Sequence, residues 1–174
     1  MAIRTILTEP NPILRQISKS LDKVEKEQQK LMDDMLETMY HAKGIGLAAI
    51  QIGVPLRIIV MDISSKEENN KEPMFFVNPV IQKKNLNFST YEEGCLSVPN
   101  QFAEIVRPST CEVEYLDYYG NKKKLKAEGL LATCIQHEMD HLEGILFIDY
   151  LSKLKKSMII KKLSKQKKID RIVV

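Results

Sequence analysis

The segment His137-Glu138-Met139-Asp140-His141 carries the residue types of a hydrolytic metal site. On an α-helix of about 3.6 residues per turn, positions four apart differ by roughly 40° around the axis, so His137 and His141 face the same way. Both imidazoles can then hold one cation, while Glu138 points aside and can reach a water molecule. In zinc hydrolases such a carboxylate takes a proton from water whose pKa the metal lowers. A solvated helix that carries two histidines by chance is the alternative.

A metal site of this kind needs a third protein ligand, and no histidine follows His141. Cys134 shares the helix face, but about 10 Å of helix axis separates it from His141, so we interpret it as a wall residue beside the metal. Cys111 stands in an alternating apolar pattern that predicts a buried, inert thiol. Cys95 precedes Pro99, where we expect a strand to end, and is predicted to be the third ligand. The alternative for Cys95 is a nucleophile that a histidine activates.

Hydrophobic patterns predict the elements that position these residues. Apolar residues at helical spacing predict helices over 24–43 and 129–143, which Gly44 and Gly144 end. Short β-branched or alternating runs predict strands at 56–62, 74–78, 80–83, 88–92, 110–119 and 122–128. Because the connections are too short for βαβ units, we expect an α+β fold of short antiparallel β-sheets. They should pack around a central helix that carries the His-Glu-x-x-His motif, with an N-terminal helix and a C-terminal basic amphipathic helix.

Residues 44–53 form a segment of unusual composition between the first long helix and the first strand. Its side chains are too small for a good core strand, and its three glycines disfavour a stable helix. We therefore expect another group to approach this backbone closely.

Charged residues are distributed unevenly along the chain. The 174 residues carry 26 Lys and Arg against 23 Asp and Glu, a net charge of +3. Residues 1–150 hold 17 basic and 22 acidic side chains, whereas residues 151–174 hold nine and one. We expect a single catalytic domain over 1–150 and a basic helix and tail over 151–174. Taken alone, such a charge run is most often a solvated face.

Composition excludes several classes of protein. The chain is 44% hydrophobic and 28% charged, which is typical of a globular domain and excludes general disorder. No apolar run approaches the roughly 18 residues of a membrane span, and the first ten residues lack the apolar core of a signal peptide. Three irregularly spaced cysteines indicate reduced thiols. We expect a cytoplasmic protein with neither a membrane nor DNA as a partner.

Three segments together resemble one family. They are residues 44–51 (Gly-Ile-Gly-Leu-Ala-Ala-Ile-Gln), 93–97 (Glu-Gly-Cys-Leu-Ser) and 136–142 (Gln-His-Glu-Met-Asp-His-Leu). They look like the three signature motifs of peptide deformylases, in the family's order and at its approximate spacing, and the second resembles the bacterial type. The resemblance implies removal of the formyl group from N-formylmethionine at the start of nascent polypeptides, with release of formate.

The resemblance also implies roles for individual residues. The implied metal ligands are Cys95, His137 and His141, with Glu138 as general acid-base and with Gln51 and the backbone N–H of Leu96 holding the oxyanion. A peptide would lie extended between the first two motifs, where Gly46 and Gly94 let main chain pair with main chain. The implied pocket for the methionine side chain consists of Ile45, Leu130, Cys134 and the edge of His137.

Three further positions bear on the substrate. Thr133 and Tyr91 stand where family members often carry aliphatic residues, which changes the outline of the pocket. Arg107 matches a basic position of the family and is expected to steer or orient the substrate. A plain surface salt bridge is the alternative for Arg107.

The cofactor expected from the resemblance is one divalent metal ion, Fe²⁺ in the cell, with Zn²⁺ or Ni²⁺ as alternatives that a thiolate and two imidazoles also suit. The expected partners are N-formylmethionyl nascent peptides and, through the basic C-terminal helix, the ribosome. One rival function is a small metalloprotease with the same motif, which would need a further His or Glu as third ligand. Another is a structural metal-binding or RNA-binding module in which the basic tail is the functional part.

Overall fold

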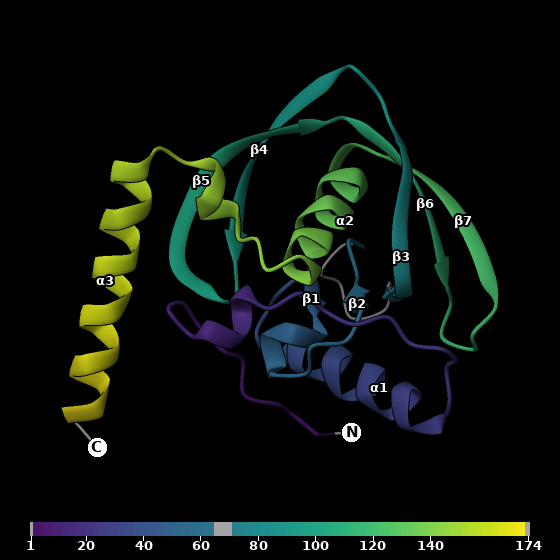
Figure 1. The fold of residues 1–174 in the computed structure, drawn as a ribbon, viewed down its shortest axis with the longest axis horizontal. Coiled ribbons are helices and arrows are strands. Elements are labelled where there is room, and N and C mark those ends of the chain that lie inside the picture. The colour runs from purple at the N-terminus through teal and green to yellow at the C-terminus, as the bar shows by residue number, and fades with distance from the viewer. Residues whose placement is uncertain (1, 65–70, 173–174) are drawn as a thin grey trace.

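The computed structural model describes residues 2–64 and 71–172, and its helix α2 (Gly129–Leu142) lies between a five-stranded sheet and a two-stranded hairpin (Figure 1). The sheet is antiparallel and has the order β1-β2-β3-β6-β7. Its strands are β1 (Gly46–Ala48), β2 (Ile58–Met61), β3 (Met74–Lys84), β6 (Thr110–Leu116) and β7 (Lys122–Glu128). The hairpin consists of β4 (Phe88–Cys95) and β5 (Val98–Pro108). The α+β prediction is confirmed.

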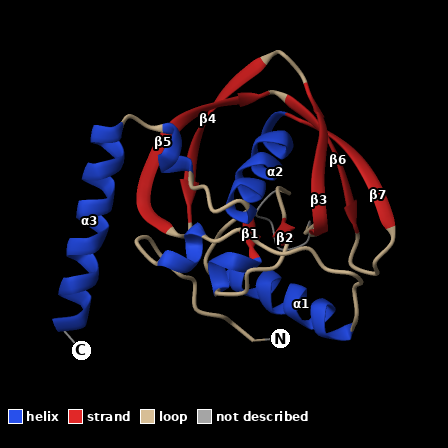
Figure 2. Cartoon of the chain, viewed as in Figure 1, coloured by secondary structure: helices blue, strands red, loops and turns tan. Residues whose placement is uncertain are grey.

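Two further α-helices and three short 3₁₀ helices complete the described elements (Figure 2). The α-helices are α1 (Lys26–His41) and α3 (Lys153–Ile172), and the 3₁₀ helices are Pro12–Arg15, Ala49–Ile52 and Phe147–Tyr150. The predicted helices at 24–43 and 129–143 therefore agree with the structure to within two residues at each end. The polar loop expected at 64–72 falls largely outside the described residues.

Strand β2 lies between two helical layers, which explains its continuous apolar sequence. Ile58 and Val60 pack in one core cluster with methionines of α1, such as Met35. Ile59 and Met61 face the other side and pack in a second cluster with residues of α2. Because neighbouring residues of a strand point to opposite faces, all four positions of β2 are buried and must be apolar. This packing fixes the position of α2 on the sheet.

Two prolines were wrongly expected to end strands. Pro79 lies inside β3, where the pairing with β6 shifts between Val77 and Val80. Such a bulge tolerates a residue that has no N–H to donate. Pro99 is the second residue of β5, an 11-residue strand that was not predicted and that pairs only with β4. A two-stranded ribbon leaves edges on which a proline removes no ladder bond.

The glycine-rich segment 44–53 forms regular structure, contrary to expectation. It contains β1 and the 3₁₀ helix Ala49–Ile52, and residues 46–51 are all buried. Gly53 ends the 3₁₀ helix at φ +82°, a conformation that favours glycine. The small side chains here bring the backbone close to α2, where a Cβ on Gly46 would meet Glu138.

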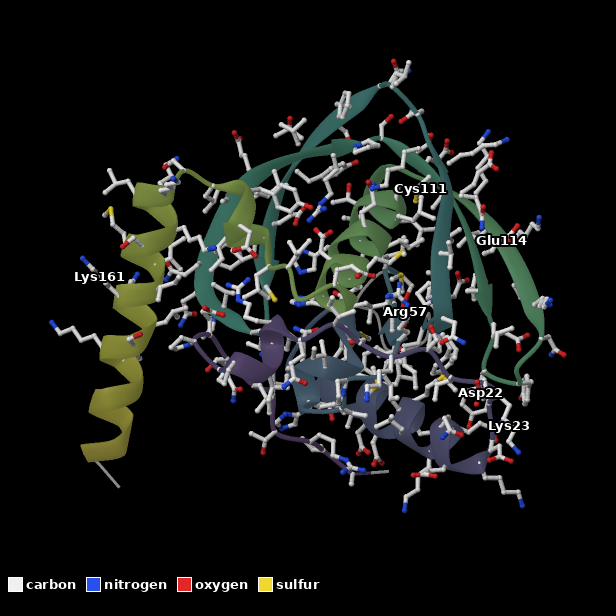
Figure 3. All side chains as sticks on the ribbon, viewed as in Figure 1. Asp22, Lys23, Arg57, Cys111, Glu114 and Lys161 are labelled. Carbon is white, nitrogen blue, oxygen red and sulfur yellow. The ribbon has the colours of Figure 1, made fainter. Side chains whose placement is uncertain are left out.

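Helix α3 packs on the outer side of the β4–β5 hairpin (Figure 1). Leu163 is 6% exposed and lies in a core cluster with Val98 and Phe147. Lys161 points outward from α3, away from the body (Figure 3). Helix α3 is thus amphipathic, as predicted, with one packed side. No helix among the described residues is long and apolar enough to cross a membrane.

Candidate metal centre and active-site cleft

Cys95, His137 and His141 bring their ligand atoms together beside α2. One sulfur and two imidazole nitrogens lie within 4.8 Å of one another. The Cys95 Sγ is 3.2 Å from His141 Nε2. Within the described part of the chain, this is the group of His, Cys, Asp and Glu side chains that could hold one ion. The structure thus brings together the three predicted ligands, and no further His or Glu of the described residues joins them.

Cys95 is the last residue of β4, where the hairpin turns through Leu96 and Ser97 into β5. This turn aims the backbone N–H of Ser97 at the Cys95 Sγ, 3.4 Å away. Gln51 Nε2 lies 3.6 Å from the same sulfur and donates to Ser97 Oγ at 3.1 Å. Both groups thus hold the sulfur in position beside the two histidines.

The ring of His137 is oriented by a carboxylate behind it. His137 Nδ1 donates to Glu93 Oε2 at 2.8 Å, which leaves Nε2 free to face Cys95. Burial opposes ionisation of Glu93, but the hydrogen bonds from His137 and Arg107 outweigh it and hold its pKa below the usual value. Metal-binding histidines commonly donate their second nitrogen to a carboxylate in this way.

Arg107 is buried behind Glu93 and does not line the cleft, which differs from both sequence-based interpretations. Its exposed fraction is 4%, so it is neither a substrate-steering group on the cleft wall nor a surface salt bridge. Its guanidinium donates to Glu93 Oε2 at 3.0 Å and to Asp140 Oδ2 at 2.8 Å, and it lies over the ring of Tyr150. Arg107 therefore fixes the carboxylate that orients His137.

The pKa values of the two imidazoles shift in opposite directions. Burial lowers the pKa of His137, yet hydrogen bonds with Cys95 and Glu93 outweigh it and hold the pKa well above the usual value. Burial and the neighbouring His137 charge lower the pKa of His141 well below its usual value, which keeps its imidazole neutral. His141 Nδ1 is buried and has no hydrogen-bond partner among the described residues. A soft sulfur and two imidazole nitrogens match the donors of a borderline divalent metal.

Glu138 lies on α2 beside the ligands and against the backbone of β1. A Cβ on Gly46 would collide with Glu138 Oε1. This contact explains why glycine is needed there, since the group that approaches the segment closely belongs to the protein itself. The other carboxylate oxygen, Oε2, is buried and has no partner among the described residues. Burial raises the pKa of Glu138 to about 7, a value suited to exchanging protons.

The ligands open into a cleft of about 490 Å³ between β1, the β4–β5 hairpin and α2. Its lining includes most of the residues that the sequence singled out: Ile45, Gly46, Gln51, Tyr91, Gly94, Cys95, Leu96, Leu130, Thr133, Cys134, His137 and Glu138. Cys134 is 5% exposed, and burial raises its pKa well above the usual value, so it lies in the wall as an uncharged thiol. Cys111 is buried in the core, as predicted.

Several residues that shape the site received no role from the sequence. Glu93 stands two residues before Cys95 in a strand, and this spacing places both side chains on one face, so the signal was present. Ser97 and Phe102 gave no such signal. A Cβ on Gly94 would lie 2.6 Å from the ring of Phe102, so the Phe102 ring packs against the Cα of Gly94 and explains the glycine there.

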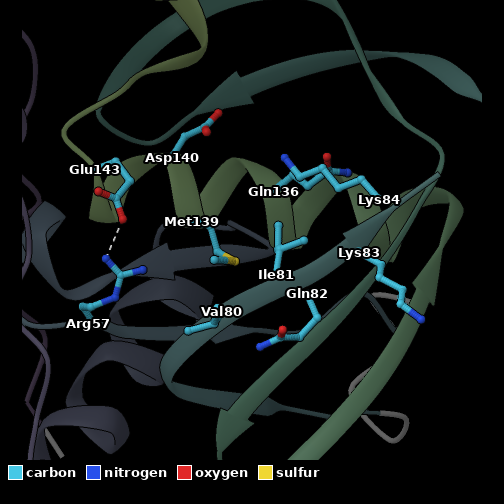
Figure 4. A pocket seen from close by; sticks show the side chains of 10 residues that line it. All are labelled: Arg57, Val80, Ile81, Gln82, Lys83, Lys84, Gln136, Met139, Asp140 and Glu143. Carbon is cyan, nitrogen blue, oxygen red and sulfur yellow. Dashed lines mark hydrogen bonds and ion pairs between the residues drawn. The ribbon is translucent and has the colours of Figure 1, made fainter. Parts of the chain in front are cut away.

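A second cavity, of about 420 Å³, lies on another face of α2 (Figure 4). Gln136, Met139, Asp140 and Glu143 line it from α2, and Glu143 pairs with Arg57. The ligands and Glu138 are absent from its wall. This cavity is therefore separate from the cleft.

Comparisons with known proteins agree with this geometry. A sequence profile described as polypeptide deformylase matches residues 3–157. The peptide deformylase of Pelagibacter ubique (strain HTCC1062) is 73% identical over 174 residues, which cover 100% of both chains. That of Maricaulis maris (strain MCS10) is 56% identical over 168 residues, or 97% of this chain and 96% of the other.

Solved structures show the same relationship. The crystal structure of peptide deformylase from Ehrlichia chaffeensis in complex with actinonin superposes with a TM-score of 0.91 and 44% identity, over 95% of this chain and 98% of that one. A peptide deformylase from Legionella pneumophila gives a TM-score of 0.89 and 44% identity over 98% of both chains. The chain therefore belongs to the peptide deformylase family, the hydrolases that release formate from N-formylmethionine at the start of nascent polypeptides.

Proposed function

We propose that deformylation takes place in the cleft and depends on one divalent cation held by Cys95, His137 and His141. The observation that carries this proposal is the cluster of one sulfur and two imidazole nitrogens within 4.8 Å, with the unpartnered carboxylate oxygen of Glu138 in the same cleft. A bound cation of this kind lowers the pKa of water and polarises a carbonyl oxygen. We propose ferrous iron in the cell, with Zn²⁺ or Ni²⁺ as alternatives, because thiolate and imidazole ligands suit all three.

Glu138 acts as the general acid-base. Hydrolysis of the formamide consumes one water, breaks the bond between the formyl carbon and the α-nitrogen, and yields formate and a free amine. Glu138 Oε2 takes a proton from the attacking water and passes it to the departing nitrogen. Burial favours both steps, because it raises the pKa of the carboxyl group to about 7, close to neutral pH.

Gln51 and the backbone N–H of Leu96 stabilise the oxyanion that forms when water adds to the formyl carbon. Gln51 is held on both sides: its Oε1 accepts from the Ala48 N–H at 2.8 Å, and its Nε2 donates to Ser97 Oγ at 3.1 Å. The second hydrogen of Nε2 faces the Cys95 sulfur at 3.6 Å and would turn to the substrate oxygen during the reaction. A fixed donor of this kind typically contributes about 3–4 kcal/mol to the stability of the transition state.

The substrate lies extended along the cleft, with its main chain beside Gly46 and Gly94. Its methionine side chain enters a pocket formed by Ile45, Leu130, Cys134 and the edge of His137, all of which line the cleft. Arg107 contributes through Glu93, by holding the orientation of His137, and makes no contact with the peptide.

Metal dependence can be tested by formate release from a formyl-Met peptide. Apoprotein should be inactive, and reconstitution with Fe(II), Ni(II) or Zn(II) in separate samples should restore turnover, with Fe(II) among the active forms. Mass spectrometry of the same peptide checks for cleavage of internal bonds, which a metalloprotease would produce. Folded protein that stays inactive with all three metals would overturn the proposal.

Residues 1–150 form the catalytic part in this proposal, and 151–174 locate the enzyme at the ribosome in the cytoplasm. Helix α3 exposes Lys161, Lys162 and Lys165, while Leu163 holds it to the body. An exposed row of lysines suits rRNA phosphates, and such binding should weaken as the salt concentration rises. Deleting α3 would uncover the buried cluster around Leu163, so charge reversal is the better test.

Replacing Lys161, Lys162 and Lys165 together by glutamate should weaken co-sedimentation with ribosomes by more than about tenfold at low salt and reduce the salt dependence. The matched control replaces Lys84, Lys122 and Lys126, three exposed lysines of the sheet, and should bind as the parent does. Both variants should keep the parent Tm and turnover. Equal ribosome binding by the two triple variants would contradict docking through α3.

A further inference from the structure

Thr133 places an unpartnered hydroxyl group in the wall of the cleft. It lies on α2 one turn before His137 and is 4% exposed. Its Oγ1 is buried and has no hydrogen-bond partner among the described residues. A threonine inside a helix can donate to the carbonyl four residues earlier, which here belongs to Gly129, but Thr133 makes no such bond. The hydroxyl therefore has a donor that no described residue uses, on a side chain that lines the cleft.

Part of the lining of this cleft is apolar. Ile45, Leu130 and Cys134 line the same cleft. Tyr91 also lines it, and its hydroxyl lies 3.5 Å from the position of a Cβ on Gly129, next to the first turn of α2. A hydroxyl that is buried without a partner costs free energy, which a ligand with a well-placed acceptor would recover. The cleft therefore suits a side chain that is mostly apolar but carries one hydrogen-bond acceptor.

We propose that Thr133 determines specificity for the first side chain of the substrate and lets the enzyme deformylate peptides that begin with formylmethionine sulfoxide. This inference rests on the proposed binding of the methionine side chain in the cleft. A thioether sulfur is a weak acceptor, whereas oxidation of methionine adds an oxygen that accepts strongly. In a wholly apolar pocket this oxygen would lose its hydrogen bonds to water and gain none from the protein, so the sulfoxide substrate would bind poorly. The Thr133 hydroxyl donates a hydrogen bond to the sulfoxide oxygen in place of water.

The experiment compares formate release from formyl-Met and formyl-Met-sulfoxide peptides of otherwise identical sequence, with each sulfoxide epimer separate and with metal-loaded enzyme. The readout is the ratio of kcat/KM for sulfoxide to kcat/KM for thioether. Thr133→Val, which removes only the donor, should lower this ratio about tenfold for the better epimer. Thr133→Ser keeps the donor and should hold the ratio within about threefold of the parent. Because a donor fixed in one wall distinguishes the two epimers, the preference between them should also shrink in the valine variant.

An unchanged ratio and epimer preference in Thr133→Val would overturn the inference. An equally large fall of the ratio in Thr133→Ser would also contradict the inference, because serine keeps the hydroxyl and the fall would then have another cause. The valine variant should have a Tm at or above that of the parent, because no hydrogen bond is lost. If it does not fold, Thr133→Ala provides the same comparison. Failure of the parent enzyme to release formate even from formyl-Met peptide would instead contradict the proposed function.

Discussion

Replacing Glu138 by glutamine should abolish nearly all turnover while leaving the fold and the bound metal in place. The amide has the shape of the carboxylate but neither accepts nor delivers the proton, so we expect kcat for a formyl-Met peptide to fall by about 10³-fold to 10⁴-fold. Glu138 is not one of the three ligand residues, so metal content measured on purified protein should equal that of the parent. Its Oε2 has no partner to lose, so the Tm should not fall.

The matched control for this variant is Glu143→Gln, five residues later. Glu143 pairs with Arg57 outside the cleft, and its side chain is 47% exposed. Turnover in this control should stay within about twofold of the parent, because an exposed ion pair contributes little. A Glu138→Gln enzyme that keeps more than a tenth of the parent kcat would show that another group carries the proton. Loss of metal from it would show instead that Glu138 acts as a ligand.

Replacing Cys95 by alanine should remove both the metal and the activity. It deletes the sulfur of a three-ligand group, and two imidazoles alone should bind a divalent cation more than a hundredfold less tightly, since even partners outside the ligand shell cost about 10-fold to 100-fold. Metal analysis after dialysis and formate release measure the two effects separately. Both should fall to background, whereas the rival interpretation as a metalloprotease with a His or Glu ligand expects both to survive.

Cys111→Ala is the matched control, because Cys111 is a buried thiol of the core that lies outside the ligand group. We expect it to lower stability slightly and to leave metal content and turnover at parent levels. Cys95→Ala protein that keeps its metal but loses turnover would favour the remaining alternative, in which Cys95 is a nucleophile. Saturating metal added back to Cys95→Ala separates weak binding from a lost chemical step.

The fold class and the grouping of the three candidate ligands were predictable because their signals are local. Two histidines four residues apart share a helix face in any tertiary context, and Cys95 lies where one strand ends. Alternating and helical periodicities likewise reported α1, α2, β6 and β7 to within a few residues. The resemblance of three short segments to the family added the roles proposed for Gln51 and Leu96, which no periodicity indicates.

Strand β5 was not predictable from the same patterns. Its polar and apolar residues do not alternate regularly, and Pro99, its second residue, suggested a break. A strand tolerates a proline where the missing N–H would not bond to a neighbouring strand. For Pro99 this depends on the pairing of β5 with β4 in a two-stranded ribbon, which the sequence does not reveal. The same reasoning applies to Pro79, whose bulge requires the partner strand β6.

The sequence by itself determined which atoms can hold a metal and exchange a proton, since these follow from residue type and spacing within a single element. Only the tertiary structure decided how those atoms are oriented. Glu93 holds His137 across 44 residues of sequence, Arg107 is buried behind Glu93, and Gly46 receives the carboxylate of Glu138. Such contacts form when elements distant in the chain pack together, and local sequence patterns do not indicate which distant elements will meet.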